Sequence, residues 1–313
     1  MRGEGFGMEN ADRPVTEEVR PQWAGLDRLG TLELLRLLNA EDRTVAGAVA
    51  GQLPRIAVVV DAVAGRMARG GRLVYAGAGT AGRLGVLDAS ECPPTFNTAP
   101  GQVVGVIAGG ARALVRAVEG AEDRPELAAA DLAALALTAE DTVVGVSASG
   151  RTPYTVAAVR GARAAGALAV GLAGSAGSPL VAAAELGIEV VTGPEVVAGS
   201  TRLKAGTAQK LVLNLLSTAV MVRLGKTYGN LMVDVRAGNA KLRDRARRIV
   251  TEITGTDEET ARRALAATGG EVKDAVLVVL AGVDAPAAAR LLAAAGGRLR
   301  EALELARGGV SRD

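Results

Sequence analysis

Residues 142–165 read TVVGVSASGRTPYTVAAVRGARAA, and this stretch decides the class of fold. It opens with a short apolar run, continues through a loop of small and hydroxyl residues, and ends in an Ala-rich segment that begins at Pro153. Proline is favoured in the first turn of a helix, and a strand with no polar face is typical of the interior of a parallel sheet. The stretch therefore predicts a central strand, a loop and a helix.

The same alternation extends in both directions along the chain. Apolar runs predict further strands at 73–76, 103–108, 168–172 and 188–191, and the intervening segments predict helices at 81–89, 113–122, 153–165, 179–186 and 203–224. Aromatic residues make up only 2% of a chain that is 49% hydrophobic, so Ala, Val and Leu must build the core. This pattern predicts an α/β fold in which helices flank both faces of a parallel sheet. Ligands of such sheets bind outside the carboxyl ends of the strands.

Different patterns flank this region. Residues 1–20 have no apolar period and predict a flexible or strapped-down arm, and amphipathic helices from Thr31 and at 56–67 lead into the main domain, which we place at 21–248. The remainder, 249–313, is predicted to be a small UBA-like helical domain. Its three-helix bundle comprises helices at 257–267, 271–280 and 285–295.

Composition excludes several kinds of chemistry. The chain contains no histidine, so the usual proton carrier near neutral pH and the commonest zinc ligand are both missing, and Cys92 alone cannot replace several ligands. The 36 basic residues nearly balance the 34 acidic ones, which gives no indication of nucleic-acid binding. One cysteine permits no intramolecular disulfide, and no stretch reaches the roughly 18 to 20 uninterrupted apolar residues of a membrane span. We expect a cytoplasmic protein without metal, cofactor, nucleic acid or membrane partner.

The loop after the central strand has the features of a phosphate site. Ser147, Ser149 and Thr152 supply three hydroxyls around Gly150, at the start of a helix whose unpaired N–H groups favour an anion. A serine or threonine that caps the helix is the structural alternative. A cap accounts for one hydroxyl and not for three, so we assign this loop to a phosphate monoester.

Two other helix starts are candidates for ligand contact. The strand at 73–76 leads into GAGTAGR, where Gly79 and Thr80 can approach a ligand, although the loop alone is equally consistent with a structural turn. No acidic residue follows the next strand, as a dinucleotide site would require. The segment 199–210 reads GSTRLKAGTAQK, in which Arg202 or Lys204 could complete an anion site. Basic residues also occur at exposed helix starts without a function.

Two glutamates are candidates for acid/base chemistry. Glu91 lies in DASECPPT, where we expect a helix to end and two prolines to hold Glu91 rigidly near the carboxyl edge of the sheet. Glu122 lies in VEGAED at 118–123, where three acids gather at a predicted helix C-terminus, an end whose dipole disfavours them. Such a placement indicates a functional role, while surface acids are the alternative for the other two.

Several of these segments resemble the N-acetylmuramic acid 6-phosphate etherase family, lyases of the sugar isomerase (SIS) domain superfamily. The resemblance covers nearly the whole chain and implies a doubly wound, SIS-type sheet. No general structural rule requires any of the strings that carry it. They are LDASECPPT (87–95), AVEGAED (117–123), SGRTPY (149–154), KAGTAQKLVLN (204–214) and GNLMVDV (229–235).

The resemblance implies cleavage of the D-lactyl ether of N-acetylmuramate 6-phosphate, which gives N-acetylglucosamine 6-phosphate and D-lactate in cell-wall sugar recycling. The two catalytic glutamates of the family fall on Glu91 and Glu122, and we assign them as acid and base, respectively. The family loop usually reads GTSGR, and Ala81 stands here where the serine would be. A homodimer is also implied.

Three other functions remain open on the same fold. A sugar-phosphate-binding regulator like the glucokinase regulatory protein is the strongest rival, but that relative carries two SIS domains and this chain has room for one. Isomerising relatives often place a glutamate at the start of the long helix, where this chain has Lys204-Ala205-Gly206. A transcriptional regulator would need an added helix-turn-helix domain with a basic face.

Overall fold

The computed structural model describes residues 15–235 and 240–309. The chain divides into two compact units, one of residues 1–89 with 101–216 and the other of residues 90–100 with 217–313. The first contains the parallel sheet and the second is mainly helical.

The sheet of the first unit has five parallel strands in the order β2-β1-β3-β4-β5. The predicted strands are all present. They are β1 (Leu73–Gly77), β2 (Val103–Ile107), β3 (Thr142–Ser147), β4 (Leu168–Ala173) and β5 (Leu186–Glu189). The strand order reverses between β1 and β3, and in such sheets the crevice outside the carboxyl ends of these two strands is where ligands bind.

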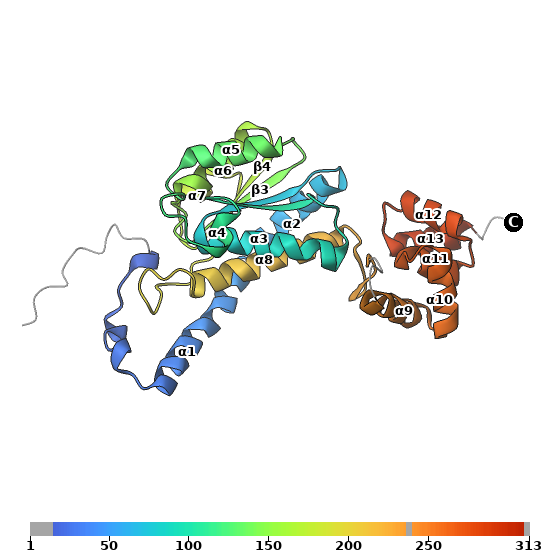
Figure 1. Ribbon diagram of the computed structural model, residues 1–313, viewed down its shortest axis with the longest axis horizontal. Helices are drawn as coiled ribbons and strands as arrows, with labels where there is room; N and C mark the ends of the chain where they lie inside the picture. The colour runs from blue at the N-terminus through green and yellow to red at the C-terminus, as the bar shows by residue number, and fades with distance from the viewer. Residues whose placement is uncertain (1–14, 236–239, 310–313) are drawn as a thin grey trace, which may run out of the picture. The chain divides into compact units, whose positions relative to one another are not determined.

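Helices cover both faces of the sheet, which confirms the doubly wound arrangement (Figure 1). One face packs against α5 (Pro125–Leu135), α6 (Pro153–Ala164) and α7 (Pro179–Ala183), and the other against α3 (Gly79–Phe96) and α8 (Lys204–Arg223). Two further helices, α1 (Thr31–Ala50) and α2 (Leu53–Ala68), precede β1, and α2 contacts β5. Side chains of β1 alternate between the two faces: Val74 joins the core under α5 and α6, whereas the Tyr75 hydroxyl donates a hydrogen bond to Asp88 of α3 at 2.8 Å.

Two predicted helix boundaries were wrong. The helix expected at 113–122 is only α4 (Arg112–Val115), and the chain then turns through Gly120, whose φ is +72°, before α5 begins at Pro125. The helix expected to end before Pro93 and Pro94 instead continues through them to Phe96. Both prolines lie in the last two turns, where the fixed φ of proline is helical, and few hydrogen bonds are lost.

The arm was predicted at 1–20, of which residues 1–14 lie outside the described residues, and from Val15 onward the segment is part of the first unit. A short 3-10 helix, η2 (Val15–Glu17), is held by a hydrogen bond from the Gly199 N–H to the Thr16 carbonyl at 2.9 Å, and Thr16 is buried. Two further short 3-10 helices, Pro21–Trp23 and Leu26–Arg28, connect it to α1.

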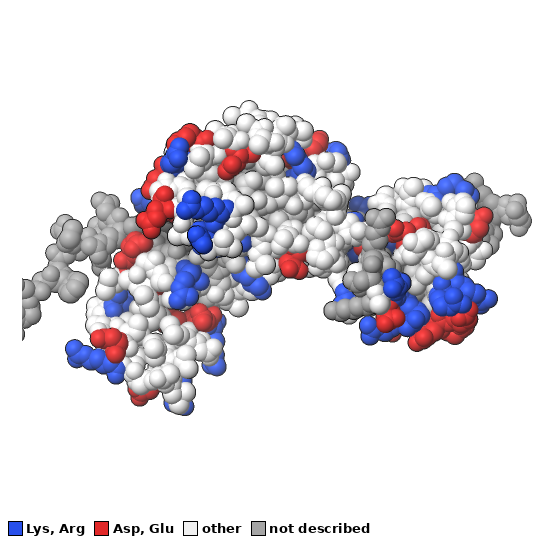
Figure 2. All heavy atoms as spheres, in the orientation of Figure 1, with Lys and Arg blue, Asp and Glu red and all other residues white. Residues whose placement is uncertain are grey.

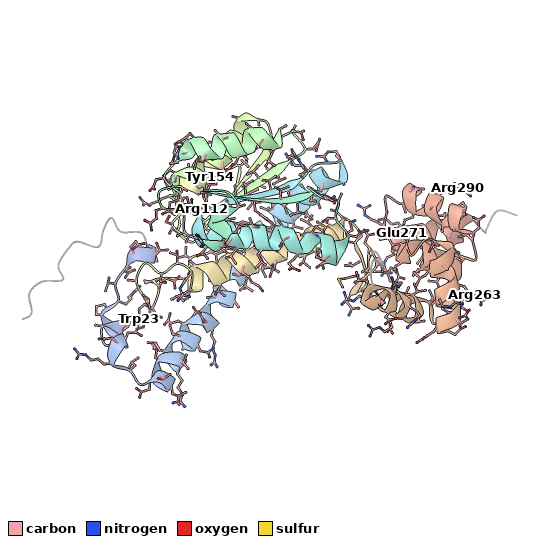
Figure 3. The ribbon with its side chains drawn as sticks, viewed as in Figure 1. Trp23, Arg112, Tyr154, Arg263, Glu271 and Arg290 are labelled. Carbon is pink, nitrogen blue, oxygen red and sulfur yellow. The ribbon has the colours of Figure 1, made fainter. Side chains whose placement is uncertain are left out.

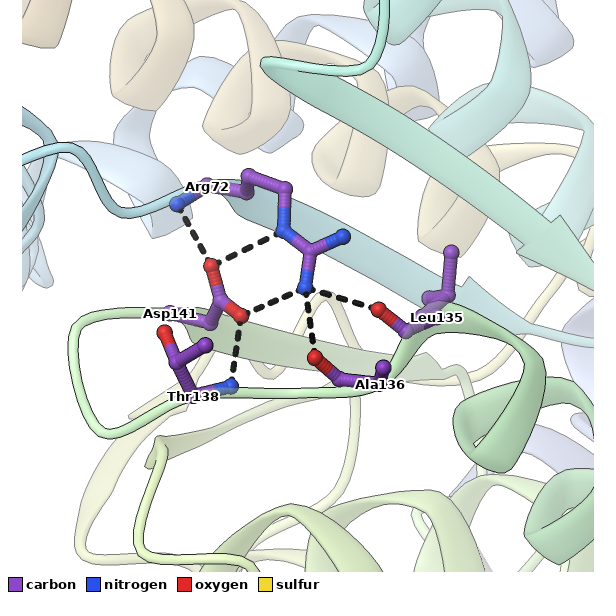
Figure 4. A network of polar contacts seen from close by, with 5 residues as sticks. All are labelled: Arg72, Leu135, Ala136, Thr138 and Asp141. Atoms are coloured by element: carbon purple, nitrogen blue, oxygen red, sulfur yellow. Dashed lines mark hydrogen bonds and ion pairs between the residues drawn. The ribbon is translucent and has the colours of Figure 1, made fainter.

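An ion pair fastens the amino ends of β1 and β3 (Figure 4). Arg72 donates two side-chain hydrogen bonds to Asp141, at 2.7 and 3.0 Å, and its guanidinium also reaches the carbonyls of Leu135 and Ala136 after α5. The Asp141 side chain is 1% exposed. Burial alone would raise its pKa, but the hydrogen bonds from Arg72 and Thr138 outweigh burial and lower the pKa to about 2. The pair lies at the edge of the sheet opposite the ligand-binding end.

The second unit contains a short hairpin, β6 (Thr227–Tyr228) with β7 (Leu231–Met232), and a group of helices. The three predicted helices are present as α10 (Glu258–Ala267), α11 (Val272–Ala281) and α12 (Ala285–Ala294). Their core is shared with α9 (Ala240–Thr254) and with α13 (Leu299–Gly309), which was not predicted. The predicted boundary at residue 249 falls inside α9.

Within the described residues, α8 is long and apolar enough to cross a membrane, and two bent helix pairs would also qualify if each were counted as a single span. The expectation that no uninterrupted apolar run of this length occurs still holds for α8, because Gln209 and Lys210 lie within it. Of the qualifying window of α8, 56% is buried within the protein, and Val212, Leu213 and Leu216 are at most 1% exposed. Core packing accounts for the apolar character of this helix. Figure 2 shows basic and acidic side chains interspersed over the visible face, in keeping with the near balance of charge.

Candidate active site

A cavity of about 410 Å³ lies where the loops after β1 and β3 meet, at the predicted binding edge. The loop after β1 contributes Gly79 and Thr80, and the loop after β3 contributes Ser147, Ser149 and Thr152. All five are residues that the sequence predicts at a ligand site, and the structure brings them to one cavity. The remaining lining residues are Thr16, Glu17, Ala78, Ala81, Glu122, Asp123, Ala148, Arg151, Pro153, Gly199, Thr201 and Gln209.

The hydroxyls after β3 are ordered by one another. Ser147 is buried, its Oγ lies 2.9 Å from the Thr152 Oγ1, and it accepts a hydrogen bond from the Gly150 N–H at 3.1 Å. Ser149 accepts from the Arg151 N–H at 3.2 Å. Thr152 stands at the N-cap of α6 but makes no side-chain cap. The capping alternative is therefore wrong for Thr152, and the hydroxyl residues of this loop line the cavity.

Gly150 is required for this loop by two constraints. Its φ is +65°, and a Cβ at this position would lie 2.3 Å from the Ser178 Oγ. Any other residue would push the loop away from the start of α7. Gly150 therefore acts by shaping the loop.

Glu122 reaches the same cavity from the turns before α5. Its backbone carbonyl accepts a hydrogen bond from the Tyr154 N–H at 3.0 Å, so the position of Glu122 is fixed relative to the first turn of α6. Tyr154, labelled in Figure 3, is itself buried. Its hydroxyl donates a hydrogen bond to Asp131 of α5 at 2.6 Å. Glu122 and Asp123 thus precede the starts of α5 and α6, where a helix dipole favours acids. The predicted unfavourable placement at a helix C-terminus was wrong.

The glycines of the loop after β1 divide into two groups. A Cβ on Gly82 would lie 2.6 Å from the Gly77 carbonyl oxygen, so these two allow α3 to pack closely against β1. Gly79 has a φ of +53°, and no atom lies within 4 Å of the place that a Cβ would take there, which leaves its backbone open to a ligand. Thr80, one residue on, lies beside Gly206 of α8, with its Cγ2 3.4 Å from the place of a Cβ.

Glu91 does not line the cavity of its own chain. It is exposed on α3, twelve residues beyond Gly79, which corresponds to about 18 Å along the helix axis. Only the predicted helix end was wrong here, because α3 continues through both prolines to Phe96 and carries Glu91 within it.

Lys204 likewise does not line the cavity. It is buried at the start of α8, its Nζ pairs with the Glu41 carboxylate at 2.7 Å, and it lies over the Trp23 ring at 5.7 Å (Figure 3). Its backbone N–H donates to the buried Glu195. Lys204 therefore ties α8 to α1 and to the N-terminal segment.

Sequence analysis missed several lining residues, above all Thr16, Glu17 and Gln209. Thr16 and Glu17 belong to a segment without any period, so no local signal marked them. Gln209 lies in KAGTAQKLVLN, a string that is unusual as a whole but does not single out this residue. Within the described parts of the chain, no group of three or more His, Cys, Asp or Glu side chains is arranged to hold a metal.

Two known protein domains match overlapping parts of residues 55–219. The N-terminal SIS domain of glucokinase regulatory protein matches residues 55–162, and the SIS domain matches residues 122–219. Among solved structures, a phosphoheptose isomerase from Francisella tularensis is similar, with a TM-score of 0.49 and 17% identity over 62% of this chain and 100% of that chain.

Much closer relatives cover most of the chain. The N-acetylmuramic acid 6-phosphate etherase of Streptomyces coelicolor is 71% identical over 85% of this chain and 86% of its own length. The etherase of Rubrobacter xylanophilus is 61% identical, covering 85% and 88%, and that of Pectobacterium atrosepticum is 54% identical, covering 90% and 92%. The chain belongs to the N-acetylmuramic acid 6-phosphate etherase family.

Proposed function

We propose that this protein cleaves the D-lactyl ether of N-acetylmuramate 6-phosphate, giving N-acetylglucosamine 6-phosphate and D-lactate. The observation that carries the proposal is one cavity, in a chain 71% identical to an etherase, that joins the hydroxyl loop after β3 to the carboxylate of Glu122. The loop suits the 6-phosphate, and the glutamate suits proton transfer.

The reaction needs one base and one acid. In the open-chain sugar, the C1 aldehyde acidifies the proton on C2, and the lactyl ether on C3 is a β leaving group. Glu122 removes the C2 proton, the C3–O bond breaks with its electron pair going to lactate oxygen, and the acid protonates that oxygen. Water then adds at C3 of the unsaturated aldehyde, and C2 regains a proton. We assign the acid, which later activates water, to Glu91.

The cavity is lined by residues of the first unit, whereas Glu91 belongs to the second. Glu91 is exposed and hence available to a neighbour. We therefore propose a homodimer in which Glu91 of one copy completes the site of the other. A cytoplasmic location, where phosphorylated sugars are metabolised, is part of the same proposal.

Incubation of the purified protein with N-acetylmuramate 6-phosphate and an assay for D-lactate test the function. Turnover in heavy water should place deuterium at C2 of the product, and turnover in ¹⁸O-labelled water should place the label at C3. Tight binding of the substrate without release of lactate would instead favour a sugar-phosphate-binding regulator.

A further inference from the structure

The part of the cavity lining that η2 and α8 contribute, here called the wall, contains two buried polar groups without hydrogen-bond partners in the described residues. Gln209 of α8 and Thr16 of η2 are each 3% exposed, and both line the cavity. Among the residues that the structure describes, no hydrogen bond reaches the Gln209 Nε2 or the Thr16 Oγ1. Buried polar groups are rarely left unpaired in native proteins, so two in one cavity wall point to a ligand that pairs with them.

Both groups are held firmly by their surroundings. Thr16 is fixed through its carbonyl, which accepts from the Gly199 N–H at 2.9 Å. Gln209 lies one turn beyond Gly206, where α8 meets Thr80 of the loop after β1. The main chain that carries the amide and the hydroxyl is therefore in place before any ligand arrives, which favours recognition.

A carboxylate lines the same cavity. The Glu17 Oε2 is 2.8 Å from the position that a Cβ on Gly199 would occupy, and Glu17 lines the cavity. The wall thus presents a donor in the Gln209 amide, an acceptor in the Glu17 carboxylate and a hydroxyl in Thr16 that can serve as either. A carboxylate there also repels the phosphate, which leaves the anion to the loop after β3.

We propose that this wall recognises the 2-acetamido group of the sugar. A secondary amide has one acceptor oxygen and one N–H donor, which match the Gln209 amide and the Glu17 carboxylate, with Thr16 as a further partner. Gln209 donates to the acetamido carbonyl, and Glu17 accepts from its N–H. The inference rests on the proposed function, because it takes the ligand to be an amino-sugar phosphate held by its phosphate at the loop after β3.

Calorimetric binding of two sugar phosphates that differ at C2 tests the assignment. Wild-type protein should bind N-acetylglucosamine 6-phosphate more tightly than glucose 6-phosphate. Gln209→Leu should weaken the binding of N-acetylglucosamine 6-phosphate about tenfold, because one neutral hydrogen bond is lost. The affinity for glucose 6-phosphate should stay unchanged. The melting temperature should hold or rise, because the substitution removes an unpaired buried amide. Glu17→Gln should likewise weaken the binding of N-acetylglucosamine 6-phosphate and leave the binding of glucose 6-phosphate unchanged.

The exposed neighbour Lys210, which does not line the cavity, supplies the control as Lys210→Met, and this variant should bind both sugars as the wild type does. The assignment would be overturned if Gln209→Leu weakened the binding of both sugars equally or of neither. It would also be overturned if the wild type bound neither sugar. Selective binding without lactate release from N-acetylmuramate 6-phosphate would uphold the assignment and contradict the proposed function. Release of lactate, together with variants that bind N-acetylglucosamine 6-phosphate no less selectively than the wild type, would uphold the proposed function and contradict the assignment of the wall.

Discussion

The Tyr154 N–H donates to the Glu122 carbonyl at 3.0 Å, and this bond joins the proposed base to the helix that begins at the phosphate loop. Tyr154 is fully buried, and both burial and its hydrogen bond to Asp131 raise the pKa of its hydroxyl, which stays protonated and keeps donating. The main chain at Glu122 is therefore held by α5 and α6, while its side chain remains exposed at the cavity.

Glu122→Gln should lower turnover at least about 100-fold, because the amide keeps the shape of the side chain but cannot accept the C2 proton. Exchange of deuterium into C2 of the sugar in heavy water should disappear with it, and the melting temperature should not change. Glu119→Gln is the matched control, since Glu119 is an exposed acid of the same turns that does not line the cavity. Product that carries no deuterium at C2 in wild-type turnover would contradict proton abstraction by any base.

Ser149→Ala should raise KM for the phosphorylated sugar while changing the free energy of unfolding by less than about 1 kcal/mol, because Ser149 makes only one local hydrogen bond. Ser147→Ala should both raise KM and destabilise the protein by about 1–2 kcal/mol, since the buried Ser147 Oγ bonds to Thr152 and to the Gly150 N–H. Steady-state kinetics and chemical denaturation separate the two effects. An unchanged KM in both variants would remove this loop from phosphate binding.

The sheet and most helices were predictable because their signals are local. Apolar runs mark strands that are buried on both faces, and proline marks the starts of α5, α6 and α7. Of these three helices, α5 was not among those predicted. The helix α13 carried its own period in Leu299, Ala302 and Leu303, which are buried, and this signal was overlooked.

The site was only half predictable because it depends on contacts between distant parts of the chain. The loops after β1 and β3 are recognisable from their own residues, and the topology of the sheet brings them together. Thr16 reaches the cavity through a bond to Gly199, some 180 residues away, which no local pattern encodes. Pro93 and Pro94 predict a helix end after Ala89 from the sequence, whereas α3 accommodates both prolines and continues to Phe96.

Stability below pH 4 should depend on Asp141. Its pKa is lowered from 3.8 to about 2 in the folded protein, so its contribution of about 2 kcal/mol is complete above pH 4 and is lost as the pH falls toward 2. Asp141→Asn should therefore be less stable than wild type at pH 7, and the difference should narrow by about 1 kcal/mol at pH 3. Urea unfolding at the two pH values measures this. Glu140→Gln, which breaks only an exposed pair with Arg69, should show a small and nearly constant difference. A gap for Asp141→Asn that stays constant with pH would contradict the assignment.

The proposed exchange of Glu91 between copies can be tested by combining two inactive variants. Glu91→Gln and Glu122→Gln should each be inactive alone, because every site then lacks one of the two glutamates. In a heterodimer of the two variants, one site receives Glu122 from the first copy and Glu91 from the second, while the other site receives neither. Heterodimers isolated through two different affinity tags should regain about half of wild-type lactate release, since one of two equivalent sites is intact. If both glutamates acted from the same chain, every site of that heterodimer would still lack one, and no activity would return. A protein that stays monomeric at assay concentrations yet releases lactate would equally contradict the shared site.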